Sequence, residues 1–295
     1  MLLIKGQHNE AKAYASIIEE EAIEQIRKIC DLDVYASSKI RIMPDVHAGA
    51  GCTIGTTMTL HGSVTPNMVG VDIGCGMETV MIREKEIDFA KLDRLIKEKI
   101  PAGMNVRNRK HSNADQTNVF DLRCMNHIEH LEKELKAIGT LGGGNHFIEV
   151  DKDEEGNLYI VIHSGSRHLG KEVAEIYQRH AYDQLKGIYQ GDLNRMIAEM
   201  KAQGREKEIA SVMAEIKKKA KTEIPRELAY VQGELFDDYI HDMKIMQEYA
   251  DIGASFFRVH RMFPRRSLTK WLSLSGAKIT KPHLSPHPGT ISKAV

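Results

Sequence analysis

The stretch His146-Phe-Ile-Glu-Val-Asp-Lys-Asp-Glu-Glu-Gly-Asn-Leu-Tyr-Ile-Val-Ile-His163 has the pattern of a β-hairpin. Two short runs of apolar residues flank a polar segment that ends in Gly-Asn, which is typical of strands joined by a turn. If Phe147 pairs with Ile162, the same register places His146 directly opposite His163. Opposed side chains in a sheet lie about 4.5–5.5 Å apart at Cβ. The hairpin therefore predicts two histidines that meet at its open end, close enough to bind metal together.

The segment that follows the hairpin, His163-Ser-Gly-Ser-Arg167, leads into a helix expected from about Gly170. Backbone N–H groups at the start of a helix and the fork of an arginine both suit an anion. Ser166 and Arg167 are therefore candidates for binding a phosphate. The alternative is an ordinary serine N-cap followed by a solvent-facing arginine.

Three further glycine-rich motifs precede the hairpin or join it. They are Met43-Pro-Asp-Val-His-Ala-Gly-Ala-Gly51, Gly70-Val-Asp-Ile-Gly-Cys-Gly76 and Gly142-Gly-Gly-Asn-His146. Glycine permits tight turns and lets the backbone approach a ligand closely. One such loop is typical of a plain turn, but four loops that each carry Asp, His, Cys or Arg indicate a shared site.

Asp72 and Cys75 are three residues apart in the second of these motifs. On a regular strand they would point to opposite faces, because side chains alternate. Gly74 and Gly76 allow the chain to turn, so both side chains are expected to reach one ion. The alternative for Cys75 is a small buried apolar residue, a common environment for a free cysteine.

The rest of the pattern predicts an α+β fold. Asp88 to Ile100 has the spacing of an amphipathic helix with Asp88 as its N-cap. We expect mixed sheets around a central metal site, with a helical insertion near residues 190–245. The highly charged block Arg195 to Lys221 is expected to form a protruding helical hairpin within that insertion.

The composition is that of an ordinary globular protein. Of 295 residues, 42% are hydrophobic and 28% charged, with 41 basic and 41 acidic side chains. These values exclude disordered, collagen-like and fibrous chains. The zero net charge argues against a broad electrostatic surface for RNA, although a local basic groove is compatible with it.

The sequence carries no pattern that favours a membrane or an oxidising compartment. It has no run of 18 apolar residues, and its first residues include Lys5, Glu10 and Lys12, so no membrane span and no signal-peptide core are expected. No C-x-x-C pair occurs, and the four cysteines are widely spaced. The cytoplasm is therefore the expected location.

The last 44 residues, 252–295, differ from the rest. They contain four arginines, four lysines and no acidic residue, so they carry +8, whereas residues 1–251 carry −8. We expect residues 1–251 to form the catalytic domain and residues 252–295 to be an aberrant basic tail. A frameshifted read-through is the favoured origin, because large apolar residues are unusual in a solvated arm. The alternative is a basic arm that binds RNA phosphates.

In this order, the four motifs resemble the RtcB family of RNA ligases over roughly residues 2–251. The resemblance implies an enzyme that joins RNA ends carrying a 3′-phosphate or 2′,3′-cyclic phosphate to 5′-hydroxyl ends. It implies GTP and two Mn²⁺ ions as cofactors, and a histidine that is guanylylated during the reaction. A cysteine thiolate alone would favour zinc, so manganese rests on the resemblance.

The resemblance also implies roles for single residues. Asp72 would bind one ion, and Cys75 would bridge both. His146 would bind an ion beside Asn145, which would contact the guanylate, and His163 would bind the other ion.

The remaining roles concern phosphate. Arg167 would contact a phosphate, with Ser166 beside it as part of the nucleotide site. Asp45 and His47, in the first glycine-rich motif, would support metal or phosphate binding.

Family members are longer than this chain, and their C-terminal third carries another metal histidine, most of the guanine pocket and the guanylylated histidine. No histidine after residue 251 lies in a family motif, so no nucleophile is assigned here, and we expect little or no ligation by these 295 residues. A second hypothesis is a non-ligating, metal-dependent protein that binds RNA ends or hydrolyses phosphoesters. A third is an inactive product of a damaged reading frame. Only a ligase of this type would form a covalent adduct with GMP.

Overall fold

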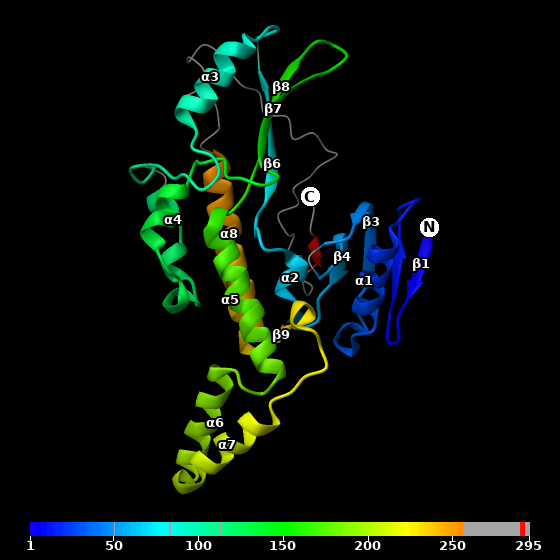
Figure 1. Ribbon diagram of the computed structural model, residues 1–295, viewed down its shortest axis with the longest axis vertical. Helices are drawn as coiled ribbons and strands as arrows, with labels where there is room; N and C mark the ends of the chain where they lie inside the picture. Colours follow the sequence, from blue (N-terminus) through cyan, green and yellow to red (C-terminus); the bar gives the residue numbers. More distant parts are fainter. Residues whose placement is uncertain (50, 83, 113, 256–289, 293–295) are drawn as a thin grey trace. The chain divides into compact units, whose positions relative to one another are not determined.

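The computed structural model describes residues 1–49, 51–82, 84–112, 114–255 and 290–292 (Figure 1). They belong to two compact units. The first unit contains Met1–Gly70, Ala174–Tyr239 and the strand β10 (Thr290–Ser292). The second contains Val71–Val173 and residues 240–255. Helices and sheets occur in both units, which confirms the predicted α+β class.

A five-stranded mixed sheet with the order β1-β2-β3-β4-β10 forms the base of the first unit. Its other strands are β1 (Leu2–Lys5), β2 (Glu10–Ala13), β3 (Ile40–His47) and β4 (Ile54–Thr59). β2 and β3 run parallel, and the other neighbouring strands are antiparallel. Helix α1 (Glu20–Cys30) packs on β1 and β2 and buries Ile26 and Ile29.

The helical block after residue 190 is present in the first unit. It comprises α6 (Gln190–Ala202), the 3₁₀ turns η5 (Glu206–Glu208) and η6 (Arg226–Leu228), and α7 (Ile209–Lys219). α7 has no fully buried residue, which agrees with the charge of this block. The predicted helices are therefore confirmed, and their protrusion stays a prediction.

A second small sheet and two short helical segments complete the described part of this unit. The sheet pairs β5 (Ser63–Val64) with β9 (Val231–Gln232), and the helical segments are η1 (Asp33–Tyr35) and α2 (Pro66–Val69). The buried Thr65 hydroxyl lies 2.8 Å from the Tyr35 hydroxyl and donates to the Leu228 carbonyl at 3.2 Å. These bonds tie η1 to the segment before β9.

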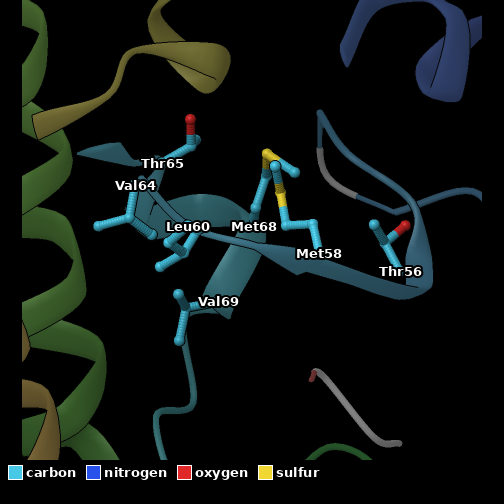
Figure 2. Close-up of a pocket in the computed structure, with 7 residues that line it drawn as sticks. All are labelled: Thr56, Met58, Leu60, Val64, Thr65, Met68 and Val69. Carbon is cyan, nitrogen blue, oxygen red and sulfur yellow. The ribbon is translucent and has the colours of Figure 1, made fainter. Parts of the chain in front are cut away.

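Figure 2 shows a small pocket beside β4, β5 and α2. Its lining residues are Thr56, Met58, Leu60, Val64, Thr65, Met68 and Val69. Its free volume of about 10 Å³ is enough for about one water molecule. The two threonine hydroxyls already bond Thr53 and Tyr35. This pocket is therefore a packing gap and does not resemble a substrate site.

The second unit contains a three-stranded antiparallel sheet with the order β6-β8-β7, seen in Figure 1 as a cyan strand beside two green ones. The strands are β6 (Gly76–Ile82), β7 (Phe147–Lys152) and β8 (Leu158–Ser164). A core of aliphatic residues from β6 and β8 packs with Ile96 of α3 (Phe89–Lys99). This core fixes the three strands against α3.

The other described elements of the second unit are short. They are η2 (Ala114–Gln116), η3 (Val119–Asp121), η4 (Met125–His127) and α4 (Leu131–Ala137). Two longer helices, α5 (Arg167–Leu185) and α8 (Glu234–Ser255), contribute residues to both units.

The predicted hairpin forms, but its register differs from the prediction by one residue. Phe147 lies opposite His163, and not opposite Ile162. The reason is that β7 continues to Lys152, and a five-residue loop, 153–157, closes the hairpin. In that loop the Asp153 carboxylate accepts the Asn157 N–H at 2.7 Å. The prediction that His146 lies directly opposite His163 is therefore wrong.

The predicted N-cap of α3 is confirmed, since the Asp88 carboxylate accepts the Lys91 N–H at 3.0 Å. We expect Asp88→Ala to lower the free energy of unfolding by about 1 kcal/mol, because one N–H of the first turn loses its acceptor. Asp88→Ser keeps an acceptor and should stay close to the wild type. Urea unfolding of both variants measures the difference, and equal losses would contradict the capping role.

Most of the predicted tail lies outside the described residues. Residues 252–255 continue α8, and 290–292 form β10. The boundary at residue 251 and the origin of the tail thus remain predictions. Within the part of the chain that the structure describes, no helix combines the length and the apolar character needed to cross a membrane.

Candidate metal and phosphate site

Cys75, His146 and His163 meet at the open end of the β6-β8-β7 sheet. The Cys75 Sγ lies 2.9 Å from the His163 Nε2 and 3.7 Å from the His146 Nε2. These three ligand atoms all lie within 4.8 Å of one another. Cys75 and His146 immediately precede β6 and β7, the two strands that flank β8, where His163 lies. The sheet order therefore brings all three to one place, despite the register error.

Asp72 reaches the same cluster through a turn. The Cys75 N–H donates to the Asp72 carbonyl at 3.0 Å, and Gly74 adopts φ +80°, as expected for a glycine that reverses the chain. The Asp72 Oδ2 lies 2.9 Å from the His146 Nε2. Its Oδ1 accepts the N–H of Ser166 at 3.0 Å and the hydroxyl of Ser166 at 3.2 Å. The structure thus brings together all four residues of the predicted ligand set.

The protonation states of Asp72 and His163 favour the binding of a cation. Burial would raise the pKa of the Asp72 carboxyl, but hydrogen bonds from His146 and Ser166 outweigh it and hold the pKa below its usual value. Burial, together with the nearby charge of His146, lowers the pKa of His163. An ionised carboxylate and a neutral imidazole are the forms that bind metal ions.

Arg167 lies beside the cluster, at the first residue of α5. Its NH1 lies 3.1 Å from the His146 Nδ1, and its Nε donates to the Thr140 hydroxyl at 3.3 Å. Burial lowers the pKa of its guanidinium, whereas the nearby Asp72 carboxylate raises it. Its backbone adopts φ +61°, a conformation that costs a non-glycine residue roughly 1–3 kcal/mol and clusters at functional sites.

Two glycines provide the space that these side chains occupy. A Cβ on Gly165 would overlap the Asp72 carboxylate, and a Cβ on Gly170 would overlap the Ser166 hydroxyl. No local pattern in the sequence indicates these individual roles for Gly165 and Gly170, or a role for Thr140. Thr140 lies two residues before the Gly142 motif, but only its contact with Arg167 reveals its part in the site.

The donor set fits a divalent cation: the Cys75 sulfur lies within hydrogen-bonding distance of an imidazole nitrogen of both histidines, and the Asp72 carboxylate lies within that distance of His146. Such mixed ligands suit a transition metal, and the thiolate by itself favours a soft one. The guanidinium beside them adds a fork that recognises phosphate. The arrangement can therefore hold a cation and a phosphate side by side.

Comparison with known proteins identifies the family. The family model described as "tRNA-splicing ligase RtcB" matches residues 25–130 and 113–257, well over half of the chain. The chain belongs to the RtcB family. The matched residues include the four residues of the ligand set and Arg167.

Among curated RtcB proteins, the RNA-splicing ligase RtcB of Escherichia coli K12 is 29% identical over 199 residues, which cover 60% of this chain and 48% of that protein. The tRNA-splicing ligase RtcB of Archaeoglobus fulgidus is 29% identical over 208 residues, 53% of this chain and 43% of that protein. That of Methanococcus maripaludis is 26% identical over 214 residues, 55% of this chain and 44% of that protein. The chain spans about half the length of the curated relatives it matches.

The RtcB resemblance assigned three further residues, Asn145, Asp45 and His47. Asn145 is exposed beside His146, and its backbone hydrogen-bonds His163. Asp45 and His47 lie on β3 in the first unit, where the His47 Nδ1 is 2.9 Å from the Asp45 carbonyl oxygen. The guanylate contact of Asn145 and the supporting role of Asp45 and His47 remain predictions.

Proposed function

We propose that this chain carries the cation and RNA-end site of an RtcB-type ligase. Such a ligase joins RNA ends with a 3′-phosphate or 2′,3′-cyclic phosphate to 5′-hydroxyl ends, using GTP and two Mn²⁺ ions. The observation that supports this most is the convergence of the Asp72, Cys75, His146 and His163 ligand atoms beside the Arg167 guanidinium. The names of the curated relatives, which are RNA-splicing and tRNA-splicing ligases, agree with it.

In this proposal the ligands divide between two ions. Asp72 and His146 would hold one ion, His163 would hold the other, and Cys75 lies near enough to both histidines to be shared. Bound Mn²⁺ would supply positive charge that neutralises phosphate oxygens. The Ser166 N–H and hydroxyl, which both donate to Asp72, keep that carboxylate aimed at His146.

The phosphate contact comes from the start of α5, and the guanylate contact comes from Asn145, just before β7. The Arg167 guanidinium offers parallel N–H donors that match a phosphate. Asn145 is exposed and would contact the guanylate. We also propose the cytoplasm as the location, because Cys75 can bind a cation only in its reduced form.

A second function is a metal-dependent protein that binds RNA ends, or hydrolyses phosphoesters, without ligating them. The reason to consider it comes from the family resemblance, which assigns the guanylylated histidine to none of the four motifs of this chain. Covalent catalysis needs a nucleophile held within reach of the reacting phosphorus.

One experiment tests the proposal. We expect Mn²⁺-dependent binding of RNA that ends in a 3′-phosphate, tighter than a 3′-hydroxyl RNA by about tenfold, since a charge-assisted hydrogen bond contributes roughly 1.5–3 kcal/mol. Arg167→Ala should remove that preference. Fluorescence anisotropy with matched RNAs measures it, and incubation with radiolabelled GTP detects covalent GMP.

The outcomes separate the two functions. A GMP adduct together with the 3′-phosphate preference assigns ligation. The preference without an adduct assigns the non-ligating function. Binding that is indifferent to both Mn²⁺ and the 3′-phosphate would contradict both.

A further inference from the structure

Gly142 lies directly against the guanidinium of Arg167. A Cβ built on Gly142 would fall among the NH1, Cζ and NH2 atoms of Arg167, so no other residue leaves room for this side chain where it lies. Gly142 is buried and adopts φ +95°. The guanidinium therefore packs on the bare α-carbon of Gly142.

The backbone of Gly142 is itself held. Its carbonyl accepts the Gly103 N–H at 2.7 Å, and it forms a β-bridge with Ala102. If a side chain were added at Gly142, the side chain of Arg167 would have to move, since these bonds hold the Gly142 backbone.

Thr140 holds the guanidinium from another direction. Its hydroxyl accepts the Arg167 Nε–H at 3.3 Å and donates to the Ala137 carbonyl at 2.6 Å, so both hydrogen-bonding roles of the hydroxyl are used. Thr140 is almost completely buried, which limits its freedom to rotate. The contacts with Gly142, Thr140 and His146 leave the guanidinium little choice of orientation.

We propose that Gly142 and Thr140 are positioning residues for Arg167, and that they set the preference of the site for RNA ends that carry a 3′-phosphate. This inference rests on the proposed function of the site. A guanidinium recognises a phosphate through a planar pair of N–H donors, so its orientation decides the strength of the contact. A displacement of about 1 Å is enough to lose a large part of such a contact.

The loop offers a matched control. Gly144 has φ +73°, close to that of Gly142, but a Cβ at Gly144 would meet nothing within 4 Å. Gly142→Ala therefore combines backbone strain with displacement of Arg167, whereas Gly144→Ala introduces the strain alone. Each variant is made in the full chain, alone and together with Arg167→Ala.

The first readout is the ratio of affinities for RNA with a 3′-phosphate and with a 3′-hydroxyl, measured with Mn²⁺. A general structural defect would weaken both RNAs and leave the ratio unchanged. We expect Gly142→Ala to lower the ratio by about tenfold, corresponding to about 1.4 kcal/mol, and Gly144→Ala to leave it within about twofold. In the Arg167→Ala background, Gly142→Ala should have no further effect on the ratio. Equal ratios for the two glycine variants, or the same loss in both backgrounds, would overturn the inference.

Thr140 gives an independent comparison by conservative substitution. Thr140→Val removes the hydroxyl and should lower the ratio, and Thr140→Ser keeps the hydroxyl and should restore most of it. A ratio that falls equally for both variants would overturn the role of Thr140.

The second readout, urea unfolding, separates this inference from the proposed function. Gly142→Ala should lower the denaturation midpoint more than Gly144→Ala does, and this extra loss should disappear when Arg167 is alanine, because the overlap is then gone. If the wild type shows no 3′-phosphate preference, the proposed function fails, and the coupling in stability alone then tests whether Gly142 positions Arg167. Additive changes in the midpoint would overturn that role, and coupled changes would support it.

Discussion

Cys75→Ala should abolish measurable binding of divalent cations. The Cys75 sulfur lies near both the His146 and His163 nitrogens, at 3.7 and 2.9 Å. Loss of an outer partner of a metal ligand already weakens binding by about 10–100-fold, so we expect the loss of this central ligand to exceed about 100-fold. Asp72→Ala and His163→Ala should each mainly weaken one of the two ions. Isothermal titration with Mn²⁺ measures the number and affinity of the ions.

Cys30→Ala provides the control, because Cys30 is a buried cysteine of the first unit whose thiol contacts the Ile4 carbonyl. Burial raises the pKa of the Cys30 thiol to about 11, so it is a thiol near neutral pH and a poor metal ligand. Its variant should bind Mn²⁺ as the wild type does. If Cys75→Ala retained both ions, the cluster would not be a metal site.

Asp242→Asn should cause the largest loss of stability that we predict. The Asp242 side chain is completely buried on α8, and its two oxygens accept the N–H groups of Arg123 and Cys124 at 2.8 and 3.0 Å. The Oδ1 also lies 2.9 Å from the His241 Nδ1. An amide has one acceptor oxygen, so one buried N–H would face another donor. We expect a loss of about 2–4 kcal/mol in the free energy of unfolding, measured with urea.

Asp237→Asn is the matched control for this substitution. Asp237 lies on the same helix but is exposed, and its substitution should change the free energy of unfolding by less than about 1 kcal/mol. A similar small effect at Asp242 would show that the two buried N–H groups find other acceptors.

Local patterns in the sequence were sufficient to predict the elements whose formation depends on neighbouring residues. The hairpin was predicted because alternating apolar residues and a polar turn lie next to each other in the chain. The N-cap of α3 was predicted for the same reason, since Asp88 and its partner Lys91 are three residues apart. The turn at Gly74, which brings Asp72 and Cys75 together, also needs only a few consecutive residues.

The register of the hairpin could not be predicted, because it depends on how the loop closes. A bond between the Asp153 carboxylate and the Asn157 N–H sets a five-residue loop, and each added residue shifts every pair along the strands. His146 nevertheless reaches His163, with ring centroids 5.3 Å apart, because it precedes β7 and the pleat does not fix its direction.

Local sequence was sufficient to identify the four motifs, the Asp, Cys, His and Arg side chains that they carry, and the family that they match. Where these side chains meet depends on the tertiary structure. Cys75 and His146 are 71 residues apart and come together because β6 and β7 both pair with β8. Gly142 holds Arg167 for a similar reason: a steric overlap between residues far apart in the chain exists only once the backbone is folded.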